Sequence, residues 1–221
     1  MNRKFDLVIF DLDGTLFDTA NSILAAFKSA VKDMNLKEVD KDELETLLGP
    51  PLETMVNRFY PSLSSDDKLK LMTLYRKHYI EDELLKAKPF DGIVDVLKKL
   101  NDDDYKVALA TYKLMNCVTP MFEHYDIKKY FTALRGTIDG MNYTKSDIMK
   151  LAISDCKVAD MNKVLMIGDT EHDFKASIEC GVYYLGMTYG FGYNDLTEEE
   201  KNYNKFLGFI DSASEIIPRI I

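Results

Sequence analysis

Two aspartates, Asp11 and Asp13, stand directly after an apolar run of strand length and are followed by Gly14 and Thr15. Alternation along an extended chain points both carboxylates to one side, and glycine lets the backbone turn sharply there. Paired carboxylates can supply a nucleophile, a general acid or base, or ligands for a hard cation. Asp13-Gly14 is also a common turn dipeptide, so the pair indicates a site only if partners follow downstream.

Such partners follow two later strands. Thr111 ends one apolar run, and Asp169 and Asp173 come directly after another. Oxygen ligands without clustered histidine or cysteine suit Mg²⁺, so the pattern predicts a Mg²⁺ site built from Asp11, Asp169 and Asp173. The alternative is that Asp169–Asp173 only places acids at a helix N-terminus, where the helix macrodipole favours negative charge.

Lys145 is the candidate cation of this site. The segment Thr144-Lys145-Ser146-Asp147 has the form of a capping box, which puts Lys145 in the first turn of a helix. The macrodipole disfavours a cation there, so a functional reason is expected, with an exposed surface lysine as the alternative.

Apolar runs and their periodicity predict the elements that position these residues. Strands are predicted at 5–10, 106–111, 131–138, 163–169 and, as the last strand, 182–189. Helices are predicted at 19–34, 42–48, 52–59, 66–85, 93–100, 114–124, 144–156 and 171–180. Strands that alternate with helices imply a doubly wound parallel α/β sheet, which brings the strand ends to one ligand-binding edge.

No convincing strand lies between Asp18 and Leu85, so residues 18–85 are predicted to form a helical domain inserted into a core of residues 1–17 and 86–221. The inward-facing residues expected in its long helix are Leu69, Met72, Leu74, Tyr75 and Tyr79.

Composition excludes several classes of protein. The chain has 221 residues, is 46% hydrophobic and carries a net charge of -9, which argues against nucleic acid or an anionic membrane as a partner. No stretch could span a bilayer, and the three widely spaced cysteines show no disulfide framework, so a cytoplasmic location is expected. A monomer is favoured, although the sequence leaves the oligomeric state open.

Four motifs together resemble the haloacid dehalogenase-like (HAD) phosphohydrolase superfamily. They are Asp11-Leu12-Asp13-Gly14-Thr15, Thr111 after a strand, Lys145, and Gly168-Asp169 with Asp173. The inserted helices are similar to those of the helical-cap branch, which includes phosphoglycolate phosphatase-like and β-phosphoglucomutase-like proteins. The resemblance implies a Rossmann-like core with an α-helical cap domain, and Mg²⁺-dependent hydrolysis of a small phosphate monoester.

The resemblance also implies a role for each acid. Asp11 would be the nucleophile that forms an aspartyl phosphate, and Asp13 the general acid and base. Mg²⁺ would bind the Asp11 carboxylate, the backbone carbonyl of Asp13 and the Asp169 carboxylate. Asp173 would orient the metal shell or Lys145.

Phosphate or substrate contacts are expected from Thr111, Lys145 and Gly14. Tyr112 stands where the family often has a small or amide residue, so its bulk is expected to narrow the pocket or stack on a substrate. Lys113 is expected to be an exposed lysine at a helix start, with a substrate contact as the alternative.

The helical insertion is expected to close over the phosphate site and to contact the leaving group. Arg58 in it is expected to be solvated, with a contact to a second anionic group as the alternative. Tyr189–Tyr193, which contains two glycines, is expected to shape the rim of the site.

Other functions remain open at this point. A β-phosphoglucomutase-like mutase would pass the phosphoryl group to a sugar, although Thr15 favours a phosphatase. A receiver-like signalling module would be phosphorylated without turnover, although receivers lack a long helical insertion. Asp13 argues against dehalogenation, because a halide leaves without a proton.

Overall fold

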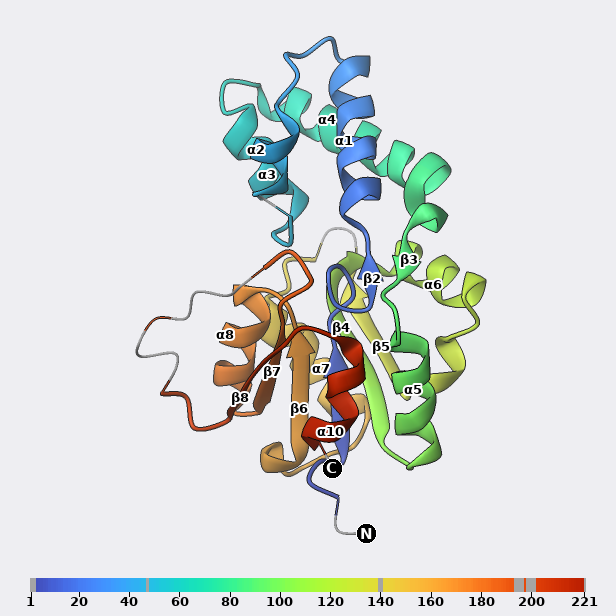
Figure 1. The fold of residues 1–221 in the computed structure, drawn as a ribbon. Helices are drawn as coiled ribbons and strands as arrows, with labels where there is room; N and C mark the ends of the chain where they lie inside the picture. The colour runs from blue at the N-terminus through green and yellow to red at the C-terminus, as the bar shows by residue number, and fades with distance from the viewer. Residues whose placement is uncertain (1–2, 47, 139–140, 193–196, 198–201, 221) are drawn as a thin grey trace. The chain divides into compact units, whose positions relative to one another are not determined.

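The computed structural model describes residues 3–46, 48–138, 141–192, 197 and 202–220 (Figure 1). The chain divides into two compact units, which are described separately. The core unit comprises Met1–Asp18 and Pro89–Ile221, and the helical unit comprises Thr19–Lys88.

The core unit contains a six-stranded sheet with the order β5-β4-β1-β6-β7-β8, in which every neighbouring pair is parallel. The strands are β1 Leu7–Phe10, β4 Lys106–Leu114, β5 Ala133–Thr137, β6 Val164–Gly168, β7 Tyr183–Met187 and β8 Phe206–Ile210. A second, two-stranded sheet pairs β2 Phe17–Asp18 with β3 Lys88–Pro89. The predicted doubly wound parallel sheet is therefore confirmed.

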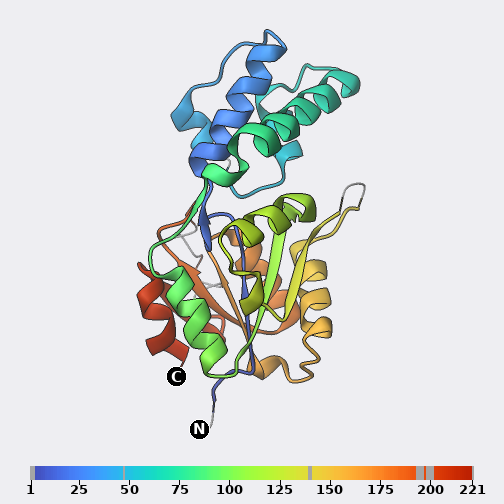
Figure 2. The same ribbon diagram turned by 90° about the vertical axis from the view of Figure 1, so that its right-hand side faces the viewer.

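Helices cover both faces of the large sheet (Figure 2). Their bounds are α5 Ile93–Asp102, α6 Met115–His124, α7 Lys145–Asp155, α8 Glu171–Cys180 and α10 Ile216–Ile220, with 3₁₀ turns at Lys128–Tyr130, Met161–Lys163 and Ala213–Glu215. Leu7 and Ile9 of β1 and Met166 of β6 pack with Met149 of α7 and Phe174 of α8 in one buried cluster. Alternate residues of a strand share a face, so this cluster fixes which side of the sheet α7 and α8 occupy.

Two strands differ from the prediction. The strand expected at 106–111 continues through Leu114, and its register against β5 shifts between Ala110 and Leu114. Residues 182–189 do not contain the last strand, because β8 follows and pairs with the outer edge of β7, Met187 opposite Ile210. Most of β8 is only partly buried, as is usual at a sheet edge, so its apolar run lacks the continuous burial of β1.

The helical unit consists of α1 Ala20–Asp33, α2 Lys41–Glu45, α3 Leu52–Phe59 and α4 Ser65–His78, followed by a π-helical turn at Tyr79–Glu83 and a 3₁₀ turn at Leu84–Lys86. Phe27 of α1, Met55 of α3 and Leu71 of α4 belong to its own buried cluster. The prediction of one continuous helix over 66–85 was wrong at its end, where the acidic run Glu81–Glu83 opposes the macrodipole. Leu69 is 57% exposed rather than inward-facing.

His78 links α4 to α1 within this unit. Its Nε2 lies 2.8 Å from Asp33 Oδ2, and its Nδ1 lies 3.1 Å from Asp82 Oδ2. The hydrogen bonds to Asp33 and Asp82 favour the protonated ring and raise the pKa of His78 above its usual value.

We expect the helical unit to become easier to open as pH rises. Because the pKa of His78 is higher when folded, its stabilisation is complete below about pH 6.5 and is lost as pH passes the raised value. Amide exchange protection of α1 and α4, compared between pH 6 and pH 9, should fall in the wild type and stay level in His78→Gln. The exposed neighbour Lys77→Gln is the control, and an equal fall in all three proteins would contradict this role.

Among the described residues, the longest apolar helical stretches fall short of what crossing a bilayer requires.

Candidate active site

The carboxyl ends of three adjacent strands carry the predicted polar residues. Phe10 of β1 is in register with Leu109 of β4 and Ile167 of β6. Asp11 therefore follows one residue later, at the same edge of the sheet as Thr111 and Asp169. The Asp11 amide still donates to the Ile167 carbonyl at 3.0 Å, which holds its backbone in the line of the sheet.

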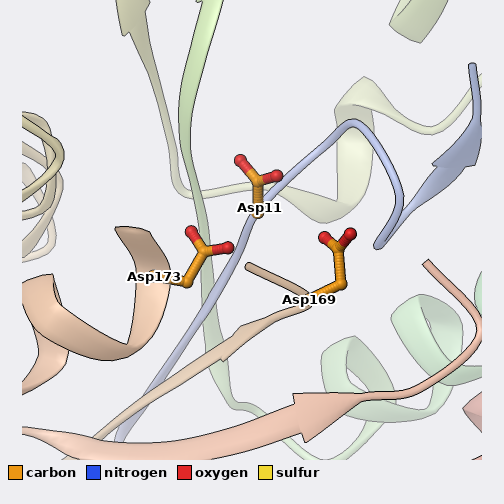
Figure 3. Close-up of side chains that lie close together, drawn as sticks. All are labelled: Asp11, Asp169 and Asp173. Atoms are coloured by element: carbon orange, nitrogen blue, oxygen red, sulfur yellow. The ribbon is translucent and has the colours of Figure 1, made fainter. Parts of the chain in front are cut away.

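Three carboxylates gather at this edge (Figure 3). Asp11 follows β1, Asp169 follows β6, and Asp173 lies in the first turn of α8; all three side chains are buried. One oxygen from each lies within 4.8 Å of the others. The structure thus brings together the acids that the sequence placed at separate strand ends.

Lys145 lies among these acids and is not an exposed lysine. Its Nζ lies 2.5 Å from Asp11 Oδ1 and 2.7 Å from Asp173 Oδ1, and the side chain is 4% exposed. The capping box predicted for this helix is present, with Thr144 and Asp147 bonding to each other's backbone N–H groups. The helix start therefore fixes Lys145 where its side chain reaches the acids.

Burial and neighbouring charges both shift the pKa values of Asp11, Asp169 and Lys145. Burial raises the pKa of Asp11 most strongly, Lys145 lowers it and Asp173 raises it, which together bring it to about 7. Burial also raises the pKa of Asp169, with Asp11 and Asp173 adding to the effect. Burial lowers the pKa of Lys145, but the attraction of Asp11 and Asp173 outweighs it and the net shift is upward. Lys145 therefore stays charged.

Asp173 is held by the start of its own helix. Its Oδ2 accepts hydrogen bonds from the Thr170 amide at 3.1 Å and the Thr170 hydroxyl at 2.7 Å. Its Oδ1 faces Lys145. Gly168 leaves the required space, since a Cβ there would lie 2.5 Å from the Asp173 carboxyl carbon. Thr170 fixes Oδ2 and Lys145 contacts Oδ1, so Asp173 is placed to orient Lys145.

Asp169 is held by two donors from other parts of the chain. Its Oδ1 accepts from the Thr15 hydroxyl and its Oδ2 from the Phe191 amide, each at 2.7 Å. Gly14 packs directly against it at a φ of +84°, and a Cβ there would lie 2.2 Å from Asp169 Oδ2. Glycine at position 14 therefore allows both the positive φ of this turn and the close approach of the Asp169 carboxylate to the backbone.

Asp13 and Lys113 form a second ion pair, which the sequence did not predict. Lys113 Nζ lies 2.7 Å from Asp13 Oδ1, and the two side chains are 8% and 18% exposed. The expectation of an exposed lysine at a helix start was wrong, because β4 continues through Leu114 and keeps Lys113 in the sheet. The buried Thr111 hydroxyl accepts the Lys113 amide hydrogen at 3.1 Å.

Two further predicted contact residues are Tyr112, which lies beside Lys145, and Arg58, which lies in the helical unit. The Tyr112 hydroxyl accepts a hydrogen bond from the Lys145 amide at 3.0 Å, so it is engaged with α7. Arg58 is exposed on α3 of the helical unit and not in the core unit that carries the other site residues.

The donor set fits a divalent cation. The buried carboxylates of Asp11 and Asp169 offer only oxygen ligands, which suits Mg²⁺. Asp169 keeps an unused lone pair on each oxygen after its bonds to Thr15 and Phe191. Burial, with a smaller contribution from the neighbouring acids, raises the pKa values of Asp11 and Asp169, and the charge of a bound cation would lower them.

Together the fold and this acid centre define a doubly wound α/β protein with a buried carboxylate and lysine site at the carboxyl edge of its sheet. The pattern of the haloacid dehalogenase-like hydrolase family matches residues 8–187, and the chain belongs to this family of enzymes. The family resemblance drawn from the motifs is therefore confirmed.

Individual relatives agree with this membership. Probable phosphatase IndB of Dickeya dadantii is 28% identical over 86% of this chain and 84% of its own length. A phosphoglycolate phosphatase of Agrobacterium fabrum is 28% identical over 86% and 82%. The crystal structure of a predicted phosphatase from Clostridium acetobutylicum superposes with a TM-score of 0.84 at 28% identity, covering 98% of each chain.

The sequence reasoning missed several residues that hold the acids. Thr170 fits the pattern of a threonine three residues before an acid, which predicts a capping box and could have identified its bond to Asp173. The loop after β7 was expected only to shape the rim, yet the Phe191 amide contacts Asp169 and the Tyr189 hydroxyl donates to the Thr15 carbonyl at 2.9 Å. Tyr193 of that loop lies outside the described residues.

Gly190→Ala should damage this site. A Cβ there would lie 2.3 Å from both Asp169 Oδ2 and the Gly14 carbonyl oxygen, and hydrogen bonds from Thr15 and Phe191 hold Asp169 in place. We expect a loss of about 1–3 kcal/mol in unfolding free energy, as for other overpacked sites, and a weaker thermal shift with Mg²⁺.

Gly181→Ala is the matched control. Gly181 has a φ of +66° with open space around it, so alanine there costs roughly 1–2 kcal/mol in backbone strain without touching Asp169. Thermal melts with and without Mg²⁺ separate the two effects. A normal Mg²⁺ shift in Gly190→Ala would show that the loop does not hold Asp169 in a conformation that Mg²⁺ binding requires.

Proposed function

We propose that the chain is a Mg²⁺-dependent phosphatase that hydrolyses a small phosphate monoester through an aspartyl phosphate. The observation that carries this proposal is the buried Lys145 ammonium between Asp11 and Asp173, next to Asp169. A lysine among buried acids at the ligand-binding edge suits a dianionic phosphate group, which needs positive charge in a chain of net charge -9.

Asp11 is the proposed nucleophile. Its carboxylate oxygen attacks phosphorus, and the bond from phosphorus to the leaving alkoxide breaks as the aspartyl phosphate forms. The contact with Lys145 favours the ionised carboxylate that burial opposes. Lys145 also offsets the negative charge that gathers around the reacting phosphoryl group.

Asp13 is the proposed general acid and base. It would give a proton to the leaving oxygen and then take one from the water that hydrolyses the aspartyl phosphate. Its side chain is 18% exposed, so it is accessible to a leaving group and to water. The contact from Lys113 Nζ to Asp13 Oδ1 holds this side chain in place.

Mg²⁺ would be held by the Asp11 carboxylate, the Asp13 backbone carbonyl and the Asp169 carboxylate, with Asp173 orienting Lys145. When bound, it would reduce the repulsion between the carboxylate and the phosphate group. Thr15 and the Phe191 amide already fix the rotamer of Asp169 that this role requires.

Thr111 is proposed to bind a phosphate oxygen. Its hydroxyl oxygen accepts from the Lys113 amide, and the hydroxyl hydrogen can still be donated to the phosphate group. Gly14, in the turn after β1, is proposed to offer its backbone to the phosphate group close to Asp169.

The helical unit, Thr19–Lys88, is proposed to act as a cap that excludes water and contacts the leaving group. Arg58 on α3 is the proposed contact for a second anionic group of the substrate. A small phosphate ester in the cytoplasm is the proposed substrate class, in keeping with the free thiols of Cys117, Cys156 and Cys180.

The test is inorganic phosphate release from a panel that includes phosphoglycolate, nucleoside monophosphates, sugar phosphates and pyrophosphate. Release that requires Mg²⁺ and stops with a chelator supports the proposal. Isomerisation of a hexose phosphate without net release would instead indicate a mutase. A stable aspartyl phosphate without turnover would indicate a receiver-like module.

Mg²⁺ should stabilise the folded chain, and more so at higher pH. Because burial raises the pKa values of Asp11 and Asp169, these acids must lose protons before they bind a cation, and protons compete with the metal. At free Mg²⁺ a hundredfold above its Kd, the gain is about 2.7 kcal/mol. Melting temperatures with Mg²⁺ or chelator at pH 6 and pH 8 measure it.

Asp169→Asn should remove most of this Mg²⁺ shift, whereas Asp160→Asn, at an exposed 3₁₀ turn, should retain it. An equal shift in both variants would place the metal elsewhere.

A further inference from the structure

Tyr112 contacts Lys145 at two points. Its hydroxyl accepts the Lys145 amide hydrogen at 3.0 Å, and the Lys145 ammonium lies 5.5 Å from the centre of its ring. The first N–H groups of a helix have no partner within the helix, so the hydroxyl satisfies a donor that would otherwise depend on water. The ring face also attracts the ammonium through a cation–π interaction.

The other contacts of Lys145 fix its ammonium but not its backbone amide, which is bonded to Tyr112. The ammonium is anchored to Asp11 and Asp173, and Thr144 caps the Asp147 amide two residues further along the helix. Tyr112 therefore contacts the backbone of the first residue of α7 and, through its ring, the ammonium of the same residue. A small or amide side chain at position 112 could not supply the ring contact.

Tyr112 is itself held firmly. Its carbonyl oxygen accepts from the Thr137 hydroxyl at 2.7 Å, and its ring packs edge-on against His172 at 5.6 Å between centroids. Burial raises the pKa of Tyr112, so the phenol stays neutral around pH 7. The residue therefore bridges β4, β5, α7 and α8 at the point where Lys145 enters the site.

We propose that Tyr112 is a positioning residue that fixes Lys145 between Asp11 and Asp173, and that it does not bind the substrate. The hydroxyl is engaged with α7, and the ring contacts the Lys145 ammonium and His172, so Tyr112 is occupied by contacts within the core unit. The effect on turnover rests on the proposed phosphatase function, whereas the effect on Lys145 does not.

The proposal predicts graded effects on turnover. Tyr112→Phe keeps the ring and loses the hydroxyl, and should lower kcat by about threefold to tenfold, the scale of one hydrogen bond. Tyr112→Leu also loses the ring face and should lower kcat by about 30-fold. For each ester, whatever its leaving group, the KM of both variants should equal that of the wild type. A rise in KM that varies with the leaving group would overturn the proposal, because it would show substrate contact.

A double-mutant cycle with Lys145→Met decides whether Tyr112 acts through Lys145. If it does, Tyr112→Leu should have little further effect on kcat once Lys145 is absent, and the two stability losses should be non-additive. Additive losses in both quantities would overturn the proposal. Tyr203→Phe is the matched control, because it removes a hydroxyl bonded to the Val182 carbonyl away from the site, and kcat should not change.

The stability cycle also separates this inference from the proposed function. If the wild type hydrolyses none of the esters, the phosphatase proposal fails, and thermal stability of the four proteins still shows whether Tyr112 and Lys145 are coupled. Crystal structures of Tyr112→Leu should show the Lys145 ammonium displaced from Asp173. An unmoved ammonium would overturn the inference.

Discussion

Asp11→Asn should lower kcat for every phosphate ester by roughly 10⁴-fold or more, the scale expected when a covalent nucleophile is removed. The amide has nearly the same shape as the carboxylate but cannot attack phosphorus to form a stable acyl phosphate. The fold should survive, because Lys145 keeps its contact with Asp173 and the Asp11 backbone bond to Ile167 does not involve the side chain.

The measurement is single-turnover phosphate release with intact-mass detection of the phosphorylated chain. The wild type should carry one phosphoryl group during turnover, and Asp11→Asn should carry none. Asp6→Asn, at an exposed position immediately before β1, is the matched control and should behave as the wild type. Unchanged turnover in Asp11→Asn would refute Asp11 as the nucleophile.

The sequence was sufficient to predict which strand ends meet. Continuous apolar runs identify β1 and β6 because both are buried throughout, and parallel pairing then brings Asp11 and Asp169 to one edge. The role of Lys145 could be predicted for a different reason. Its capping box shows where α7 begins, and a cation in the first turn of a helix opposes the helix macrodipole, which indicates a functional reason for it.

Contacts that depend on strand length and on long side chains could not be predicted in the same way. Lys113 reaches Asp13 only because β4 runs past Thr111, and propensity does not show where a strand ends. Tyr112 and Lys145 are 33 positions apart in the sequence, and no local sequence pattern predicts a contact between them. The Phe191 contact with Asp169 uses a backbone N–H, which carries no residue signature at all.

Lys145→Met should lower kcat by about a hundredfold or more, the scale of losing one electrostatic group at a reacting centre. Methionine fills much of the same volume without charge, so the loss reflects the ammonium rather than an empty space. Asp11 and Asp173 would then face each other with no cation between them. The variant should therefore also be less stable, because buried like charges remain uncompensated.

The pH dependence of this stability loss has a definite sign. The folded-state pKa of Asp11 is already raised from 3.8 to about 7, so its burial costs nothing below about pH 4 and increasingly more as pH rises. Without Lys145, the main influence that lowers this pKa is gone, and the cost keeps growing above pH 7. The stability difference between wild type and Lys145→Met, measured with chelator present, should therefore be larger at pH 8 than at pH 5.

Lys106→Met is the control for this measurement. Its ammonium donates to the Cys156 carbonyl at 2.8 Å from the beginning of β4, away from the acids. Its loss should give the same stability difference at both pH values and leave turnover unchanged. Added Mg²⁺ should restore part of the stability of Lys145→Met, since a divalent cation compensates the same carboxylates. A stability difference that shrinks with rising pH would mean that Lys145 does not hold the Asp11 charge.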